Sequence, residues 1–185
     1  MHSLKNKAGI RNAITGTMMR HRPHFRGKMV SAEWLKRTEM FEALEDIQLN
    51  VILSHASVES CPEGKIIFQE GEEATHVYVL IQGAIDVTMK AQEEIGILMF
   101  RIQTEGRVFG VPSLLEPYRY NMTAKCAVPS RVLRIDADHL RTQMEENPGL
   151  GMGIMKKLAL TYFNRLNELR TQVVNYFKTF SPKVP

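Results

Sequence analysis

The stretch 106–127 holds the residues whose types and spacing could bind a small anion. Phe109 and Gly110 end an apolar segment there, and Pro112 is a favoured first residue of a short helix. A glycine turn before a helix exposes backbone N–H groups and the positive end of the helix dipole. The stretch therefore predicts a small-molecule site, although a Phe-Gly pair is also common as a tight turn with a packed aromatic ring. The surrounding elements must decide between these two interpretations.

The composition is that of an ordinary soluble globular protein. The 185 residues are 44% hydrophobic and 24% charged, which is enough for one sizeable core. No apolar run approaches the roughly 18 residues that a membrane span requires. The two cysteines, Cys61 and Cys126, stand alone, which argues against a disulfide framework, a zinc site or an iron–sulfur cluster. We therefore expect a reducing, cytoplasmic location.

Basic charge is concentrated at the start of the chain. The formal net charge is +4, and residues 1–28 contain seven Lys or Arg residues with no Asp or Glu. The rest of the chain is therefore net negative. Residues 1–30 are predicted to be a basic leader, and several interpretations are open: a true start at Met29, plain disorder, a transit peptide, or a contact for nucleic acid or an anionic membrane surface.

Helical patterns flank a central region of strand patterns. Ser31 can cap a helix, and a turn of helix is expected again at 51–56. The first pattern has an apolar face made of Trp34, Leu35, Met40, Phe41, Leu44 and Ile47. Between them and the C-terminal helix, short segments with glycine turns predict strands at 58–61, 65–69, 76–81, 84–90, 95–103, 107–109, 120–128 and 131–135. In the segment 84–90, Ile85, Val87 and Met89 should face the core. Eight short strands at this spacing predict a closed β-roll or barrel.

The C-terminal segment has a heptad pattern. Asn147 and Pro148 can start a helix, and its apolar residues recur at alternating spacings of four and three. These residues are Met155, Ala159, Tyr162, Leu166, Leu169, Val173 and Tyr176. They predict a dimerisation helix at 148–178 that pairs with a second copy, followed by a tail at 179–185. The alternative is an amphipathic helix lying on its own barrel through Leu158 and Phe163, and one helix can do both.

The order of these elements resembles the cyclic-nucleotide-binding domain family, which includes catabolite activator proteins, kinase regulatory subunits and nucleotide-gated channels. The similarity runs from about Leu35 to Arg170. The motifs that carry it are LKR and FEAL between residues 35 and 44, PEGKIIFQEG at 62–71, VYVLIQG at 77–83 and GRVFG at 106–110. The resemblance implies an α+β fold: an eight-stranded antiparallel β-roll of the jelly-roll type at 31–147. N-terminal helices, a short helix in the phosphate cassette and the long C-terminal helix complete it.

The phosphate cassette departs from the pattern of nucleotide-binding members. Those members have Phe-Gly-Glu, whose Glu binds the ribose hydroxyl, and an Arg three positions before a Thr or Ser, which pairs with the phosphate. Here Val111 replaces the Glu and Pro112 offers no N–H. Tyr120 stands three positions before Thr123, and Arg119 is one residue early, which turns a strand side chain to the opposite face.

The resemblance implies a stand-alone regulatory or sensor module, not an enzyme, whose divergent cassette binds a small neutral or weakly anionic molecule. Ligand occupancy would then change contacts with a protein partner through the C-terminal helix. The candidate ligand residues are Phe109, Gly110, Val111, Ser113, Arg119, Tyr120 and Thr123. The alternatives are a genuine cAMP or cGMP binder that uses Arg119, or an interaction module without a ligand.

Three other functions are weighed against this one. Haem binding could use His76, Cys61, Cys126 or one of the 11 Met residues, but none has a specific spacing. A cupin-type metal enzyme needs clustered histidines, whereas the barrel segments contain only His76. No metal site or firm cofactor is therefore expected. The family's transcription factors continue into a helix-turn-helix domain of some sixty residues, for which the sequence after Phe177 is too short, so sequence-specific DNA binding is not expected.

Overall fold

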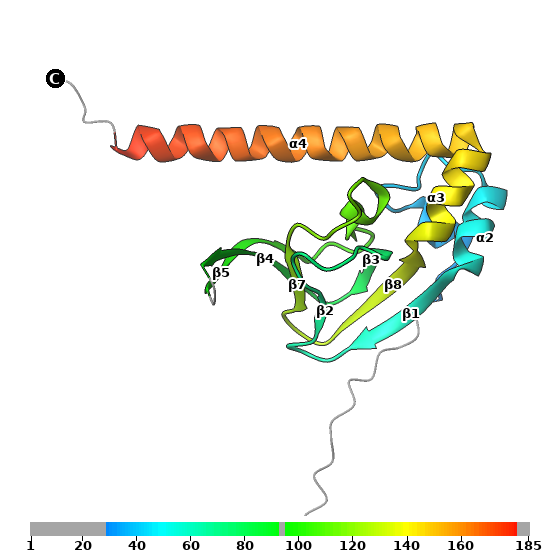
Figure 1. Cartoon of the computed structure of the whole chain (residues 1–185), viewed down its shortest axis with the longest axis horizontal. Coiled ribbons are helices and arrows are strands. Elements are labelled where there is room, and N and C mark those ends of the chain that lie inside the picture. Colours follow the sequence, from blue (N-terminus) through cyan, green and yellow to red (C-terminus); the bar gives the residue numbers. More distant parts are fainter. Residues whose placement is uncertain (1–28, 93–94, 181–185) are drawn as a thin grey trace, which may run out of the picture.

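Apolar segments between residues 56 and 136 form two antiparallel sheets in the computed structural model, which describes residues 29–92 and 95–180 (Figure 1). The first sheet has the order β1 (Ala56–Cys61), β8 (Ser130–Asp136), β3 (His76–Gln82) and β6 (Val108–Phe109). The second has the order β2 (Ile66–Phe68), β7 (Thr123–Cys126), β4 (Ile85–Gln92) and β5 (Ile95–Ile102). Their pairing confirms the predicted eight-stranded antiparallel roll.

Strand β3 separates two hydrophobic cores because it is buried on both faces. Val77, Val79 and Ile81 face a core shared with the helices. Tyr78 and Leu80 point into the interior of the roll. A side chain in the first core therefore touches the helices, and one in the second touches the inside of the roll.

The sequence pattern predicted these strands with small errors at their ends. β1 begins at Ala56, two residues early, because α2 ends at Ser54. β7 begins at Thr123, so Tyr120 precedes it. In β4, Ile85 and Val87 are buried as predicted, whereas Met89 is 39% exposed because the β4–β5 hairpin extends beyond the core.

The N-terminal helices are shorter than the apolar pattern indicated. α1 (Ala32–Lys36) begins where the Ser31 hydroxyl accepts a hydrogen bond from the Trp34 N–H. The chain then turns, and α2 (Asp46–Ser54) follows. Met40, Phe41 and Leu44 lie in these turns and are buried. Their spacing suggested a helix because successive tight turns repeat at nearly the helical period. The prediction for Ile47 was wrong, since it is 71% exposed at the start of α2.

Two helices close the chain, and the second is much longer than the roll requires. α3 (Ala137–Glu146) is preceded by Asp136, whose side chain accepts a hydrogen bond from the His139 N–H at 2.7 Å and so caps the helix. α4 (Pro148–Phe180) packs through its first turns, where Leu150, Ile154 and Leu158 are buried. Leu158 contacts the body as predicted, but Phe163 is 61% exposed. α4 then runs on past the body, above β4 and β5 (Figure 1).

Candidate functional site

The predicted cassette forms a short 3₁₀ helix, η1 (Val111–Leu114), between β6 and β7. Gly110 precedes it with φ of 74°, which favours glycine. A Cβ atom on Gly110 would lie 2.9 Å from Cδ2 of Tyr78 and 3.0 Å from the carbonyl oxygen of His76. The turn therefore brings the backbone close against β3. Because Pro112 has no N–H, the start of this short helix offers an anion fewer hydrogen-bond donors than an ordinary helix N-terminus does.

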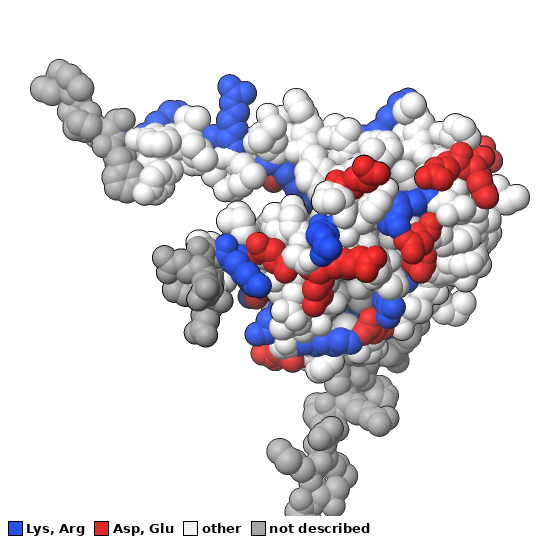
Figure 2. Space-filling view, viewed as in Figure 1, with Lys and Arg blue, Asp and Glu red and all other residues white. Residues whose placement is uncertain are grey.

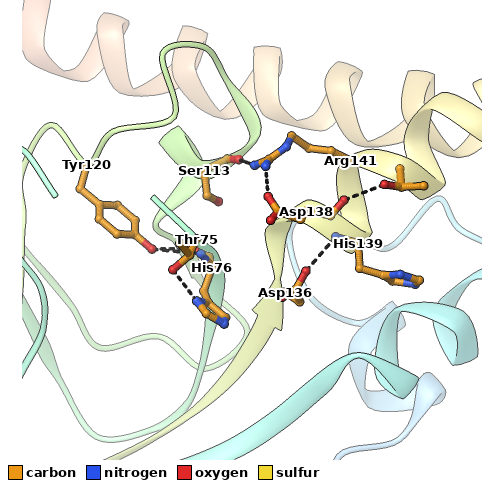
Figure 3. Close-up of polar contacts among 9 residues, drawn as sticks. Thr75, His76, Ser113, Tyr120, Asp136, Asp138, His139 and Arg141 are labelled. Carbon is orange, nitrogen blue, oxygen red and sulfur yellow. Dashed lines mark hydrogen bonds and ion pairs between the residues drawn. The ribbon is translucent and has the colours of Figure 1, made fainter. Parts of the chain in front are cut away.

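Tyr120 occupies the position that an arginine holds in the cassette pattern, and its side chain is buried in the roll. Its hydroxyl donates to the carbonyl oxygen of His76 at 2.9 Å and accepts from the His76 N–H at 3.2 Å (Figure 3). The ring stacks on Phe68, with centroids 3.8 Å apart and planes at 12°. Burial raises the pKa of the Tyr120 hydroxyl, so the group stays neutral.

Three of the predicted ligand residues do not direct a polar side chain into a ligand site next to the cassette. Arg119 is exposed, and its Nη1 donates to the carbonyl oxygen of Gly71 at 2.9 Å. The Thr123 hydroxyl accepts the Glu70 N–H at 3.0 Å. Ser113 is fully buried, and its hydroxyl oxygen has no hydrogen-bond partner among the described residues. Because Arg119 is one residue before the arginine position of the pattern, it points outward, and Tyr120, which occupies that position, points inward.

A cavity of about 480 Å³ lies between the roll, the cassette and α4. Figure 2 shows the surface hollowed between α4 and the β4–β5 hairpin. Of the candidate ligand residues, Phe109, Gly110, Val111 and Tyr120 line this cavity, whereas Ser113, Arg119 and Thr123 do not. The other lining residues are Phe68, Val87, Met99, Phe100, Arg101, Ile102, Arg107, Pro112, Asn121, Met122, Tyr162, Arg165, Leu166, Glu168, Leu169 and Gln172.

β5 and α4 contribute residues to this cavity that the sequence pattern did not indicate. Met99 and Phe100 come from the hairpin, and Arg165 comes from α4. One signal was present: Tyr162, Leu166 and Leu169 were recognised as a heptad seam, and Arg165 lies next to that seam on a helix. The sequence alone did not indicate that this face of α4 lies above the cassette.

The arginines of the cavity differ in their pairing. Arg101 makes two hydrogen bonds to Asp86, at 2.5 and 2.8 Å, which lower the pKa of that carboxyl. Arg107 lies 3.4 Å from Oε1 of Glu39. Arg165 has no ion pair among residues 29–92 and 95–180, and its guanidinium lies 5.4 Å from the centre of the Phe100 ring. Burial, followed by repulsion from Arg107, lowers the pKa of Arg165.

Arg141 ties the cassette to α3 (Figure 3). Its guanidinium donates to the carbonyl oxygen of Ser113 and pairs with Asp138. It also lies 4.2 Å from the centre of the Tyr118 ring. One side chain therefore contacts both the end of η1 and the loop that follows, and α3 leads directly into α4.

Comparison with known proteins identifies the fold and family. Residues 58–147 match the family model of the cyclic nucleotide-binding domain. The crystal structure of a putative cyclic nucleotide-binding protein from Geobacter metallireducens is 31% identical, with a TM-score of 0.66, and the match covers 75% of this chain and 99% of that one. The chain belongs to the cyclic nucleotide-binding domain family. The sensor domain of the transcriptional regulator DNR from Pseudomonas aeruginosa, at 23% identity, TM-score 0.60 and coverage of 70% and 91%, shares the fold.

Full-length regulators of this family match over part of their length. A CRP-like cAMP-activated global transcriptional regulator of Mycobacterium tuberculosis is 24% identical over 127 residues, which are 69% of this chain and 56% of the regulator. The global nitrogen regulator of a Nostoc species is 32% identical over 106 residues, which are 55% of this chain and 46% of that protein. The chain thus spans about half the length of the curated relatives it matches.

Two kinds of feature are absent from the part of the chain that the structure describes. No three His, Cys, Asp or Glu side chains among residues 29–92 and 95–180 gather as a metal site. In the same part of the chain, no helix has the length and apolar character needed to cross a bilayer. Most of the predicted leader (1–28) and of the predicted tail (181–185) lies outside the described residues, and α4 runs two residues into the predicted tail, to Phe180.

Proposed function

We propose that this domain is a regulatory module in which a small molecule, bound between the β-roll and α4, changes the contacts that α4 makes with a second copy or a protein partner. The observation that carries the proposal is the lining of the cavity. Gly110 and Val111 of the cassette and Leu166 and Leu169 of α4 line the same space. A molecule there touches both the cassette and the helix, and it shifts their arrangement if it binds one arrangement more tightly.

The Arg141 contacts support a second connection between the cassette and α4. Any shift of η1 moves the Ser113 carbonyl that Arg141 holds, and Arg141 belongs to α3. At the junction of the two helices, the Asn147 side chain accepts the Leu150 N–H at 3.1 Å, which fixes the start of α4. The cassette, α3 and α4 are thus joined by direct contacts.

The exposed face of α4 supports pairing with a second copy. The seam residues Met155, Tyr162, Leu166, Leu169 and Val173 are between 38% and 63% exposed. Their heptad spacing suits an identical helix, which could cover this apolar face. Because Tyr162, Leu166 and Leu169 also line the cavity, ligand and second copy would contact the same side chains.

The divergent cassette favours a ligand other than a cyclic nucleotide. Tyr120 is fully engaged by His76 and Phe68, and it offers no positive charge. Arg119 would have to leave the Gly71 carbonyl and turn to the other side of the backbone to reach a phosphate in the cavity. Burying a phosphate without its paired cation is costly, because the strongest anion contacts are charge-assisted.

Ligand screening combined with hydrogen exchange tests this proposal. Purified full-length protein is screened by thermal shift with cAMP, cGMP and a metabolite library, and amide exchange is measured with each compound that raises Tm. We expect at least one compound to slow exchange in both 109–114 and 155–176. Compounds that raise Tm without altering exchange in α4, or a complete absence of stabilising compounds, would contradict the proposal. If cAMP binds and Arg119→Ala abolishes that binding, only the claim that the ligand is not a cyclic nucleotide would be contradicted.

A further inference from the structure

The cassette end of the cavity is apolar. Phe68, Phe109 and Tyr120 form its wall, and their rings pack on one another. The Tyr120 hydroxyl is already bonded to the backbone of His76. Together with the missing N–H of Pro112, these contacts leave this end without an obvious partner for a charged group, and they suit an aromatic or other flat apolar body.

Positive charge reaches the same cavity from α4 and from the loop before β6. Arg165 belongs to α4, and Arg107 belongs to that loop. Repulsion between these two guanidinium groups contributes to the lowered pKa of Arg165, after burial. An anion placed between them would relieve this repulsion, and guanidinium groups bind carboxylates and sulfonates through charge-assisted hydrogen bonds.

The carboxylates around the cavity leave Arg165 as the cation best placed for a ligand. Asp86 is held by Arg101, and Glu39 shares its Oε1 between Arg107 and the Thr161 hydroxyl, at 3.4 and 2.9 Å. Glu168 is exposed and makes no ion pair with Arg165 among the described residues. Attraction from Glu39 and Glu168 offsets only part of the effect of burial and of Arg107 on the Arg165 guanidinium, so an anion in the cavity would compensate the remainder.

We infer, on the basis of the proposed function, that this cavity binds an organic acid with an aromatic body. A phosphate-binding cassette would hold the acid group itself, whereas here the aromatic body lies against the cassette. The acid group pairs with Arg165 and Arg107 beneath α4, and the rings lie against Tyr120, Phe68 and Phe109. A cavity of about 480 Å³ is of the size that takes such a molecule, since ligand pockets span roughly 300 to 1,000 Å³. Because its acid group would contact α4, the ligand would also hold the helix over the roll.

A pair of fluorescent dyes tests the inference. Anilinonaphthalene sulfonate has an aromatic body and an acid group, and phenylnaphthylamine has the same rings without the sulfonate. Both are titrated into full-length wild-type protein, Arg165→Gln and the control Arg170→Gln. Arg170 is an exposed arginine of the same helix that does not line this cavity. Circular dichroism and Tm confirm that the variants are folded.

We expect the sulfonate to bind with one molecule per chain and to weaken about tenfold in Arg165→Gln, which is the effect of losing a charge-assisted hydrogen bond. Its affinity should be unchanged in Arg170→Gln, and binding of the neutral dye should be unchanged in both variants. Dye bound only to the exposed apolar face of α4 would not depend on Arg165. Equal loss of both dyes in Arg165→Gln, or equal loss of the sulfonate in both variants, would overturn the inference.

The two proposals fail in different ways. If neither dye binds, or if cAMP displaces the sulfonate and Arg119→Ala abolishes that displacement, the inference about the ligand is wrong. The regulatory proposal survives either result as long as some compound slows amide exchange in both the cassette and α4. If the sulfonate binds through Arg165 but no compound, the dye included, slows exchange in α4, the assignment of the ligand class stands and the regulatory proposal fails.

Discussion

At the scale of single residues, the side chain in the arginine position decides the character of the cassette. Tyr120 fills the inner space of the roll with a neutral ring that stacks on Phe68, and Arg119 is directed outward to Gly71. The local backbone makes this arrangement compact, because Gly110 approaches β3 too closely for any Cβ atom. The side of the cavity formed by the cassette is therefore closely packed and uncharged.

The close approach of Gly110 gives a prediction about stability. Gly110→Ala places a Cβ atom 2.9 Å from Tyr78 at a positive φ, so it combines a clash with backbone strain. Gly71→Ala is the matched control, since Gly71 also has a positive φ, of 88°, but nothing within 4 Å of the added atom. We expect the control to lose about 1–2 kcal/mol of unfolding free energy and Gly110→Ala to lose about 1–3 kcal/mol more. Urea denaturation measures both, and equal losses would contradict the clash.

At the scale of elements, the short helix η1 is held by α3 as well as by its own strands. Arg141 contacts the Ser113 carbonyl, Asp138 and the Tyr118 ring at once. The arrangement joins a segment of four residues to a helix that continues into α4. The position of η1 is thus sensitive to the position of α3, and the reverse also holds.

Removing the Arg141 contacts should loosen the cassette locally. Arg141→Gln cannot bridge Ser113, Asp138 and the Tyr118 ring, so we expect faster amide exchange at 113–118 and a loss of about 1–2 kcal/mol of stability. Arg134→Gln, at an exposed arginine of β8, is the control and should leave exchange in 113–118 unchanged. Exchange and urea denaturation are measured for both variants. Unaltered exchange in Arg141→Gln would show that η1 is held by its strands alone.

At the scale of the whole molecule, α4 extends beyond the body and leaves one apolar face uncovered (Figure 1). Only its first turns pack in the core, through Leu150, Ile154 and Leu158. A large apolar face without a partner is a feature of surfaces that bind other molecules. The seam with heptad spacing makes a second copy the expected partner.

Charge introduced into the seam should prevent this pairing. Val173 belongs to the seam but does not line the cavity, so Val173→Glu tests the second copy without altering the ligand site. The control is Asn164→Glu, which adds the same charge at an exposed polar position of α4. We expect the dimer dissociation constant to rise by at least about tenfold in Val173→Glu, because an unpaired carboxylate would be buried, and to stay unchanged in the control. Sedimentation equilibrium measures both, and a monomeric wild-type protein would contradict the proposed dimer.

The sequence by itself determined the architecture of this protein. Period-two apolar segments with glycine turns, followed by a helical heptad pattern, are local signals, because they depend on neighbouring residues and on backbone geometry. They located the β-roll, the short helix after Gly110 and the long helix to within a few residues. Local signals failed where turns have nearly the same spacing of apolar residues as a helix. Met40, Phe41 and Leu44 are buried, but Ile47, which has the same spacing, is exposed.

Only the tertiary structure decided which side chains meet at the cavity. Phe100 and Arg165 are far apart in the chain, and they face each other because the hairpin and α4 extend in the same direction from the body. The sequence marked Tyr120 and Arg119 as exceptions to a pattern, but it did not give the directions in which they point. Such directions depend on how a loop enters its strand and on what already fills the core, and neither property is encoded in residue spacing.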